Sequence, residues 1–111
     1  MATTEDIKNR LEGVRGKLND PILKQRFAAF SKNLQFTFTD LDTSFVMRIE
    51  NGEMKSLAEG STESPDIHVT VESEVLMNIL SKKINPMRAY TTGKLKVKGT
   101  LTDLLKLQKL L

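Results

Sequence analysis

The sequence contains no cysteine and no tryptophan, and its only histidine is His68. Without thiols the chain forms no disulfide, no thiolate nucleophile and no cysteine-ligated metal site, and one histidine cannot supply an HExxH pair. No apolar run approaches the roughly 18–20 residues that a membrane-spanning helix needs. We therefore expect no metal, no cofactor and no transmembrane segment.

What remains has the composition of one ordinary globular domain. The chain has 111 residues, of which 39% are apolar and 28% are charged, so we predict a single domain over residues 1–111. Charge is divided unevenly along it. Residues 1–80 carry nine Lys/Arg against thirteen Asp/Glu, whereas residues 81–111 carry eight against one. Such an asymmetry indicates either an anionic partner or a solvated basic surface.

The two ends of the sequence carry no familiar targeting signal. The first six residues, Met1 to Asp6, are polar and acidic, unlike a secretory signal peptide. The last three, Lys109-Leu110-Leu111, differ from the Ser-Lys-Leu type of peroxisomal address. We expect a cytoplasmic protein.

The beginning of the chain predicts two helices. Thr3 or Thr4 suits an N-cap, and apolar residues follow at helical spacing: Ile7, Leu11, Val14 and Leu18. Asp20 and Pro21 predict the start of a second, shorter helix, because Asp caps helices and Pro fits their first turn.

A hairpin follows these helices. Alternating apolar and polar residues predict strands over residues 34–38, 45–49 and 54–58. The dipeptide Asn51-Gly52 is a strong signal for a two-residue turn, which would place Ile49 opposite Met54. The same register gives these further pairs: Met47 with Ser56, Phe45 with Ala58, and Arg48 with Lys55. The apolar face of the hairpin would then end in small side chains.

The second half predicts two more strands among three helices. A strand over residues 67–71 precedes a helix that we expect Ser73 to cap, and Asn85-Pro86 predicts the start of another short helix. A strand over residues 95–97 leads into a final helix. Because the strands cluster and do not alternate regularly with helices, we predict an α+β fold with a mainly antiparallel sheet. Helices should cover one face of that sheet.

Residues suited to catalysis do not group. His68 lies on the polar side of a strand, where we interpret it as an exposed or hydrogen-bonded structural residue. Asp40 and Asp42 fall in a predicted turn, which both residue types favour for local hydrogen-bonding reasons. An enzyme that uses these residues is the weakest of our hypotheses, and we expect no catalytic activity.

Three alternating lysines, Lys94, Lys96 and Lys98, project from one side of the last predicted strand, about 7 Å apart. They offer contacts to phosphates, but Leu95 and Val97 occupy the other side and no aromatic residue is available for base stacking. We interpret the lysines as protection of an edge strand against aggregation, and we expect no nucleic-acid partner.

The final helix, which Thr100 or Thr102 should cap, has six leucines in residues 101–111. They spread over more of its circumference than one sheet contact requires. Four methionines add adaptable side chains: Met47, Met54, Met77 and Met87. Three interpretations stay open, namely a filled core, a homodimer surface and a space for an apolar ligand.

Residues 85–99, NPMRAYTTGKLKVKG, followed by a leucine-rich helix, resemble the sterol carrier protein 2 domain. The strand over residues 36–38, the Asn51-Gly52 hairpin and residues 66–71 resemble it too, whereas the first 25 residues match only as a helix. The resemblance implies strand order 3-2-1-4-5 and an apolar tunnel for fatty acids, fatty acyl-CoA, sterols or phospholipids. It implies lipid transfer or presentation without chemistry of the domain's own.

We expect the lipid between the sheet and the C-terminal helices. The candidate lining residues are Phe36, Met47, Met77, Leu80, Met87, Tyr90, Leu104, Leu105 and Leu107. The candidates for contact with an anionic headgroup or an anionic membrane surface are Lys82, Lys83 and Arg88. The alternative is a non-catalytic interaction module with a filled core that dimerises through its C-terminal helix. The protein is thus expected to be a monomer or a homodimer.

Overall fold

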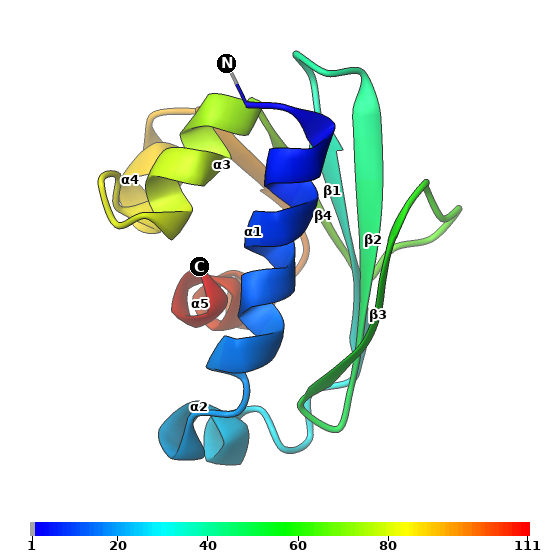
Figure 1. Ribbon diagram of the computed structural model, residues 1–111. Helices are drawn as coiled ribbons and strands as arrows, with labels where there is room; N and C mark the ends of the chain where they lie inside the picture. Colours follow the sequence, from blue (N-terminus) through cyan, green and yellow to red (C-terminus); the bar gives the residue numbers. More distant parts are fainter. Residues whose placement is uncertain (1) are drawn as a thin grey trace.

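The computed structural model describes residues 2–111, which form a five-stranded sheet with its helices in a second layer (Figure 1). The elements follow in this order: α1 (Thr4–Lys17), α2 (Pro21–Arg26), β1 (Lys32–Phe38), β2 (Thr43–Glu50), β3 (Glu53–Glu59), β4 (Ile67–Val71), α3 (Ser73–Leu80), α4 (Pro86–Thr91), β5 (Leu95–Lys98) and α5 (Leu101–Leu110). The α+β class predicted from the clustering of strands is confirmed.

The strands lie in the order β3-β2-β1-β4-β5, as the resemblance implied. All neighbours are antiparallel except β1 and β4, which run parallel because the chain crosses the sheet between β3 and β4. Side chains of the central strands alternate between a buried and a more exposed side: Leu34, Phe36 and Phe38 of β1 are buried. The core therefore lies between one face of the sheet and the helices.

The β2–β3 hairpin departs from the predicted register. Asn51 and Gly52 form the turn with φ angles of 51° and 77°, and Ile49 pairs with Met54 as predicted. A bulge next to Ile49 then shifts the ladder by one residue. The observed pairs beyond it are Arg48 with Ser56, Met47 with Leu57, Val46 with Ala58, and Phe45 with Glu59. The three predicted pairs beyond the bulge are wrong.

The bulge has a packing reason. It turns the half-buried Leu57 toward the apolar cluster and leaves Ser56 exposed. A strand without the extra residue would present the serine to the core and the leucine to water, because side chains alternate with a period of two. The apolar face of the hairpin is therefore filled at this end and does not taper to small residues.

Four helices begin as predicted. Thr3 and Thr100 cap α1 and α5 in capping boxes, while Asp20 and Asn85 cap α2 and α4 ahead of a proline. Each cap accepts hydrogen bonds from main-chain N–H groups that would otherwise lack a partner in the first turn.

The start of α3 differs. Ser73 is the first helical residue and is buried, whereas the N-cap position is held by Glu72, which makes no side-chain capping bond. The main-chain N–H and the hydroxyl of Ser73 both donate to the Asp40 carboxylate, which ties the β1–β2 turn to α3. Partial burial acts to raise the pKa of Asp40, but these hydrogen bonds outweigh it and hold the pKa below its usual value. The prediction that Ser73 caps the helix is wrong because Asp40 is its partner.

The hairpin turn docks closely against the segment that follows α2. The N–H of Gly52 donates to the carbonyl of Phe30 at 3.0 Å. A Cβ atom on Gly52 would lie 2.6 Å from the carbonyl oxygen of Phe27. Gly52 is therefore required both by its left-handed backbone and by this approach. Separately, none of the helices within residues 2–111 is long and apolar enough to cross a bilayer.

We predict that Gly52→Ala lowers the free energy of unfolding by about 2–4 kcal/mol, from backbone strain plus displacement of the Phe27 main chain. Gly93→Ala is the matched control, because Gly93 also has a left-handed φ of 81° but an added Cβ would meet open space. The control should lose only about 1–2 kcal/mol. Urea denaturation measures both values, and equal losses would show that the contact with Phe27 contributes nothing.

Candidate functional site

Helix α5 completes the helix layer and lies beside α1, on the same side of the sheet as α3 and α4 (Figure 1). One face of α5 is apolar and buried: Leu104, Leu107 and Leu110, with Leu111 directly after the helix, are all at most 8% exposed. Leu101 and Leu105 face outward and are 72% and 47% exposed. The helix is thus amphipathic toward the core but also carries leucines toward solvent.

The N-terminal end of α5 is attached to β1 by an ion pair. The Nζ of Lys32 lies 2.8 Å from the carboxylate of Asp103, whose side chain is 5% exposed. Asp103 also accepts from the N–H of Thr100 in the capping box. Burial acts to raise the pKa of Asp103, but the hydrogen bonds from Lys32 and Thr100 outweigh it and lower the pKa. This end is thus held by an ion pair whose carboxylate is nearly buried, while the Lys32 side chain is 35% exposed.

The middle and the C-terminal end of α5 are attached by lysines as well. The Nζ of Lys106 donates to the carbonyl of Arg26 at 2.8 Å and lies 5.0 Å from the centre of the Phe27 ring. At the end of the chain, Lys17 and Lys82 both donate to the carbonyl of Leu111, at 2.9 Å and 3.0 Å. Burial, together with the charge of Lys82, lowers the pKa of Lys17 to about 8. Sequence analysis missed Lys17 and Lys106, because nothing local marks a partner so distant in the chain.

The predicted lining residues fall into three groups. Phe36 and Met47, on the inner face of the sheet, and Leu107, on α5, belong to the buried core. Met77 and Leu80, on α3, are partly buried and pack against it. The structure thus brings the sheet, α3 and α5 together around one apolar interior, and side chains occupy the part of that interior where these residues meet.

The other predicted lining residues lie nearer the surface. Tyr90 and Leu104 line a groove of about 160 Å³ between α4, the end of β5 and the start of α5, together with the exposed Leu101. Met87 is half-buried on α4, and Leu105 is exposed. These side chains form an apolar rim next to the core.

The three predicted headgroup residues do converge. Lys82, Lys83 and Arg88 line one hollow of about 480 Å³, formed by the connection between α3 and α4, by α4 itself and by the residues before β5. Lys94 lines the same hollow. The sequence pattern placed Lys94 on the same side of the last strand as Lys96, but β5 begins at Leu95, so Lys94 precedes the strand.

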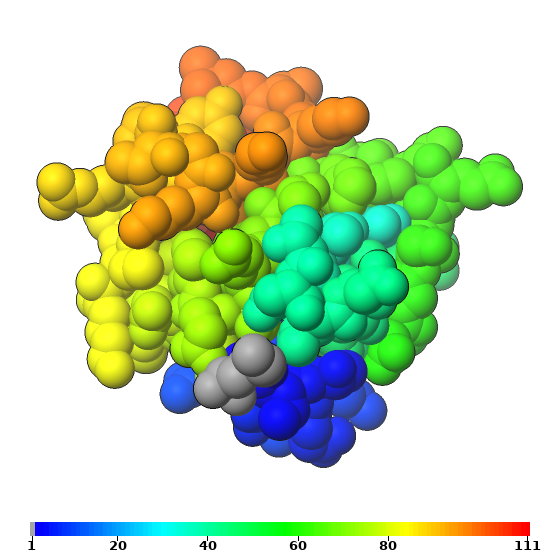
Figure 2. Space-filling view, turned by 90° about the horizontal axis from the view of Figure 1, so that it is seen from above, coloured from blue at the N-terminus to red at the C-terminus, as the bar shows by residue number. Residues whose placement is uncertain are grey.

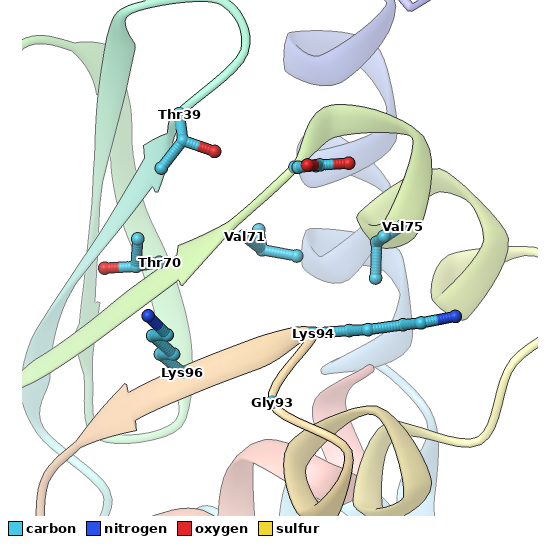
Figure 3. Close-up of a pocket in the computed structure, with 8 residues that line it drawn as sticks. Thr39, Thr70, Val71, Val75, Gly93, Lys94 and Lys96 are labelled. Atoms are coloured by element: carbon cyan, nitrogen blue, oxygen red, sulfur yellow. The ribbon is translucent and has the colours of Figure 1, made fainter.

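A second hollow, of about 450 Å³, lies where the β1–β2 turn meets α3 and the start of β5 (Figure 3). Its walls are both polar and apolar: Thr39, Thr70 and Lys96 line it together with Val71 and Val75. Lys94 and Lys96 extend from the two sides of the β5 backbone in opposite directions. Seen from above, the teal β1–β2 turn, the yellow-green α3 and the orange residues around β5 surround this hollow (Figure 2).

Two of the residues considered for catalysis, Asp40 and His68, form side-chain hydrogen bonds within the fold. The Nε2 atom of His68 lies 2.8 Å from the Thr37 hydroxyl, which also contacts the hydroxyl of Ser44. This group lies on the side of the sheet away from the helices, and His68 lines none of the hollows described above. The interpretation of His68 as hydrogen-bonded is confirmed. β5 is an edge strand, as its lysines indicated.

The fold and these attachments can be compared with known proteins. Stomatin-like protein 1 of Mus musculus is 36% identical over 74 residues, which cover 67% of this chain and 16% of that protein. Sterol carrier protein 2 of Gallus gallus is 32% identical over 69 residues, covering 62% and 12%. The region that this chain matches is thus only a small part of the length of each relative.

A solved structure extends the comparison over nearly the whole fold. Palmitated SCP2L2 from Aedes aegypti, determined by solution NMR, is 19% identical, with a TM-score of 0.68 over 92% of this chain and 90% of that one. Residues 9–111 match the family model described as the SCP-2 sterol transfer family. Together with the strand order and the helix layer, this match establishes that the chain belongs to the SCP-2 sterol transfer family.

Proposed function

We propose that the chain binds one long-chain apolar lipid between its sheet and its C-terminal helices, and that it carries or presents this lipid. A fatty acid, a fatty acyl-CoA, a sterol or a phospholipid fits this description. One observation carries the proposal: α5 closes an apolar interior with buried leucines, while lysine side chains attach its two ends and its middle. Such a helix can lift without breaking the sheet.

The free energy of apolar burial favours replacement of side chains in the interior by a lipid chain. Burying about 14 methylenes at roughly 0.8 kcal/mol each gives on the order of 11 kcal/mol. Association and ordering remove several kcal/mol of this, so affinity near the micromolar range is expected. Met47, Met77 and Met87 suit such a site, because unbranched thioethers adapt to ligands of different shape. Micromolar binding allows both capture and release.

The family and its members support the same activity. The family model is that of a sterol transfer family, and the palmitated relative carries a fatty acyl group on the same fold. We assign the anionic headgroup, or transient contact with an anionic membrane surface, to Lys82, Lys83 and Arg88, because they converge in one hollow. The proposal includes no catalytic step and no nucleic-acid partner.

We predict that the protein binds a fluorescent fatty acid saturably at low micromolar concentration. Met77→Lys should weaken this binding at least tenfold, because a charge among the lining side chains must be buried when the acyl chain enters. Ile22→Lys is the matched control, since Ile22 is 63% exposed on α2. Fluorescence titration measures all three affinities, and circular dichroism checks that the variants are folded.

Two results would contradict this prediction. One is an absence of saturable binding by the wild-type protein up to tens of micromolar. The other is a Met77→Lys protein that is folded and binds the fatty acid as well as the Ile22→Lys protein does. If Met77→Lys fails to fold, Met87→Lys makes the same test from α4, where the side chain is half-buried.

The second candidate function is self-association through α5. The observation that favours it is the outward pair Leu101 and Leu105, which lie one helical turn apart and are both exposed. Leu104 is 8% exposed, so a charge at that position would disturb the core and give no information about an interface.

We predict that any dimer formed at α5 dissociates on Leu105→Glu, because each copy would place a carboxylate in an apolar contact. Light scattering coupled to size-exclusion chromatography measures the mass at micromolar concentration. The matched control is Ile22→Glu, since Ile22 is an apolar residue on another helix and is more exposed, at 63% against 47% for Leu105. A wild-type protein that is monomeric would contradict self-association. A dimer that persists in Leu105→Glu would show that the interface does not lie at α5.

A further inference from the structure

Strand β5 (Leu95–Lys98) forms one of the two edges of the sheet. Among the strands of residues 2–111 only β4 pairs with it, and Figure 3 shows β4 along one side of β5. An edge strand presents main-chain N–H and C=O groups that no neighbouring strand pairs. The free side of β5 can therefore receive the main chain of another segment.

The outer side of this edge, which faces away from the helices, is positively charged. Lys96 and Lys98 are exposed there, opposite Thr70 and His68 of β4. In the part of the chain that the structure describes, neither lysine forms an ion pair with an Asp or Glu. Residues 81–99 contain six Lys/Arg and no acidic residue. The charge at this edge is thus not compensated by its own surroundings.

The inner side of the same edge is apolar. Val97 alternates with the lysines, is half-buried, and lines the groove of about 160 Å³ together with Tyr90, Leu101 and Leu104. Two of these large side chains are exposed, Tyr90 at 38% and Leu101 at 72%. Protection against aggregation accounts for the lysines. It does not account for an exposed apolar groove beside them, because such a surface favours association.

We propose that β5 accepts an extended segment of a partner protein as an additional strand, and that this segment alternates acidic with apolar residues. Side chains of neighbouring strands lie next to one another on each face of a sheet. Acidic side chains of the segment would lie beside Lys96 and Lys98, and an apolar side chain would lie beside Val97 in the groove. In this mode of recognition the main-chain hydrogen bonds supply affinity, and the alternate side chains supply specificity.

The lysines also select against a wrong partner. A second copy of β5 at this edge would bring lysines close to lysines, and like charges on neighbouring strands destabilise their pairing. An acidic strand meets attraction at the same positions, so the edge uses repulsion as well as attraction to discriminate. The inference is independent of lipid, because Lys96 and Lys98 are not among the residues assigned to the lipid or its headgroup.

The first experiment titrates the isotopically labelled full chain with the synthetic peptide Glu-Val-Glu-Leu-Glu-Val-Glu and records amide chemical shifts. We expect saturable shifts that are largest in β5, and binding that weakens at high salt because exposed ion pairs are screened. The control peptide has the same composition in the order Glu-Glu-Glu-Glu-Val-Leu-Val. It should bind on the order of tenfold more weakly, because its side chains cannot place acids on one face and apolar groups on the other.

The second experiment tests the lysines. Replacing both Lys96 and Lys98 by Gln should weaken binding of the alternating peptide on the order of tenfold, at up to about fivefold per exposed ion pair. The matched control replaces Lys8 and Lys24 by Gln, an equal change of charge at exposed positions on α1 and α2. All four side chains are exposed, so both double variants should remain folded.

The groove is tested by Leu101→Ser, which should weaken binding of the alternating peptide severalfold. The matched control is Ile22→Ser, because Ile22 is also apolar and is 63% exposed on another helix. Equal affinities of these two variants would show that the groove takes no part.

The third experiment tests pairing of the main chains. Successive residues of a strand direct their N–H groups to opposite edges. One modified peptide carries N-methyl groups on its glutamates, and another carries them on its apolar residues. Because only one edge of the peptide can face β5, one modified peptide should lose binding and the other should keep it. If the two bind equally, the segment does not add as a strand.

Three further results would overturn the proposal. The first is an absence of saturable shifts up to about 1 mM peptide. The second is equal binding of the alternating and the control peptide, or equal affinity of the two double lysine variants, since charge alone would then explain the attraction. The third is a shift of the β5 amides when the protein is concentrated without peptide, which would show that this edge pairs with a second copy. None of these results bears on fatty acid binding, which is measured separately.

Discussion

The constraint on which the rest of this structure depends is that helices cover only one face of the sheet, so α5 must close an interior that the other helices leave incomplete. Its buried leucines supply most of the attraction, because each fully buried leucine contributes about 1.5–3 kcal/mol. Four of them therefore contribute on the order of 6–12 kcal/mol. An acyl chain of about 14 methylenes offers roughly the same from the same kind of contact. In the function we propose, the lipid therefore replaces the leucines at little net cost in apolar burial.

Local signals in the sequence predicted most of the fold. Alternation marked the strands, Asn51-Gly52 marked the hairpin turn, and the Asp-Pro and Asn-Pro pairs marked two helix starts. The errors came from contacts between distant residues. The bulge in β2–β3 depends on whether Leu57 or Ser56 reaches the helix layer, and the role of Ser73 depends on Asp40, which lies 33 residues earlier in the chain. The order of the strands came from the family resemblance, because periodicity does not distinguish one arrangement of five strands from another.

The candidate site shows the same division. Apolar surplus in the last helix was readable, but it did not say which leucines face the core, because Leu101 and Leu105 are as apolar as Leu107 and only the latter is buried. The three predicted cations converge in one hollow, whereas Lys94 joined them only once β5 was seen to begin at Leu95. The contact of Lys17 could not be predicted from the sequence, because its partner, Leu111, lies 94 residues further along the chain. Charge asymmetry along a chain indicates either an anionic partner or a solvated basic surface, and only the fold determines which cations meet.

The two sets of lysines have different physical roles, which explains why so basic a C-terminal region is compatible with a stable domain. Lys32 is balanced by the nearly buried Asp103, so this contact fixes one end of α5. At the other end, Lys17 and Lys82 both donate to the main-chain oxygen of Leu111, and burial, together with the charge of Lys82, lowers the pKa of Lys17 to about 8. The attachments of α5 are therefore unequal: an ion pair holds its N-terminal end, whereas two lysines of like charge meet at one main-chain oxygen at its C-terminal end.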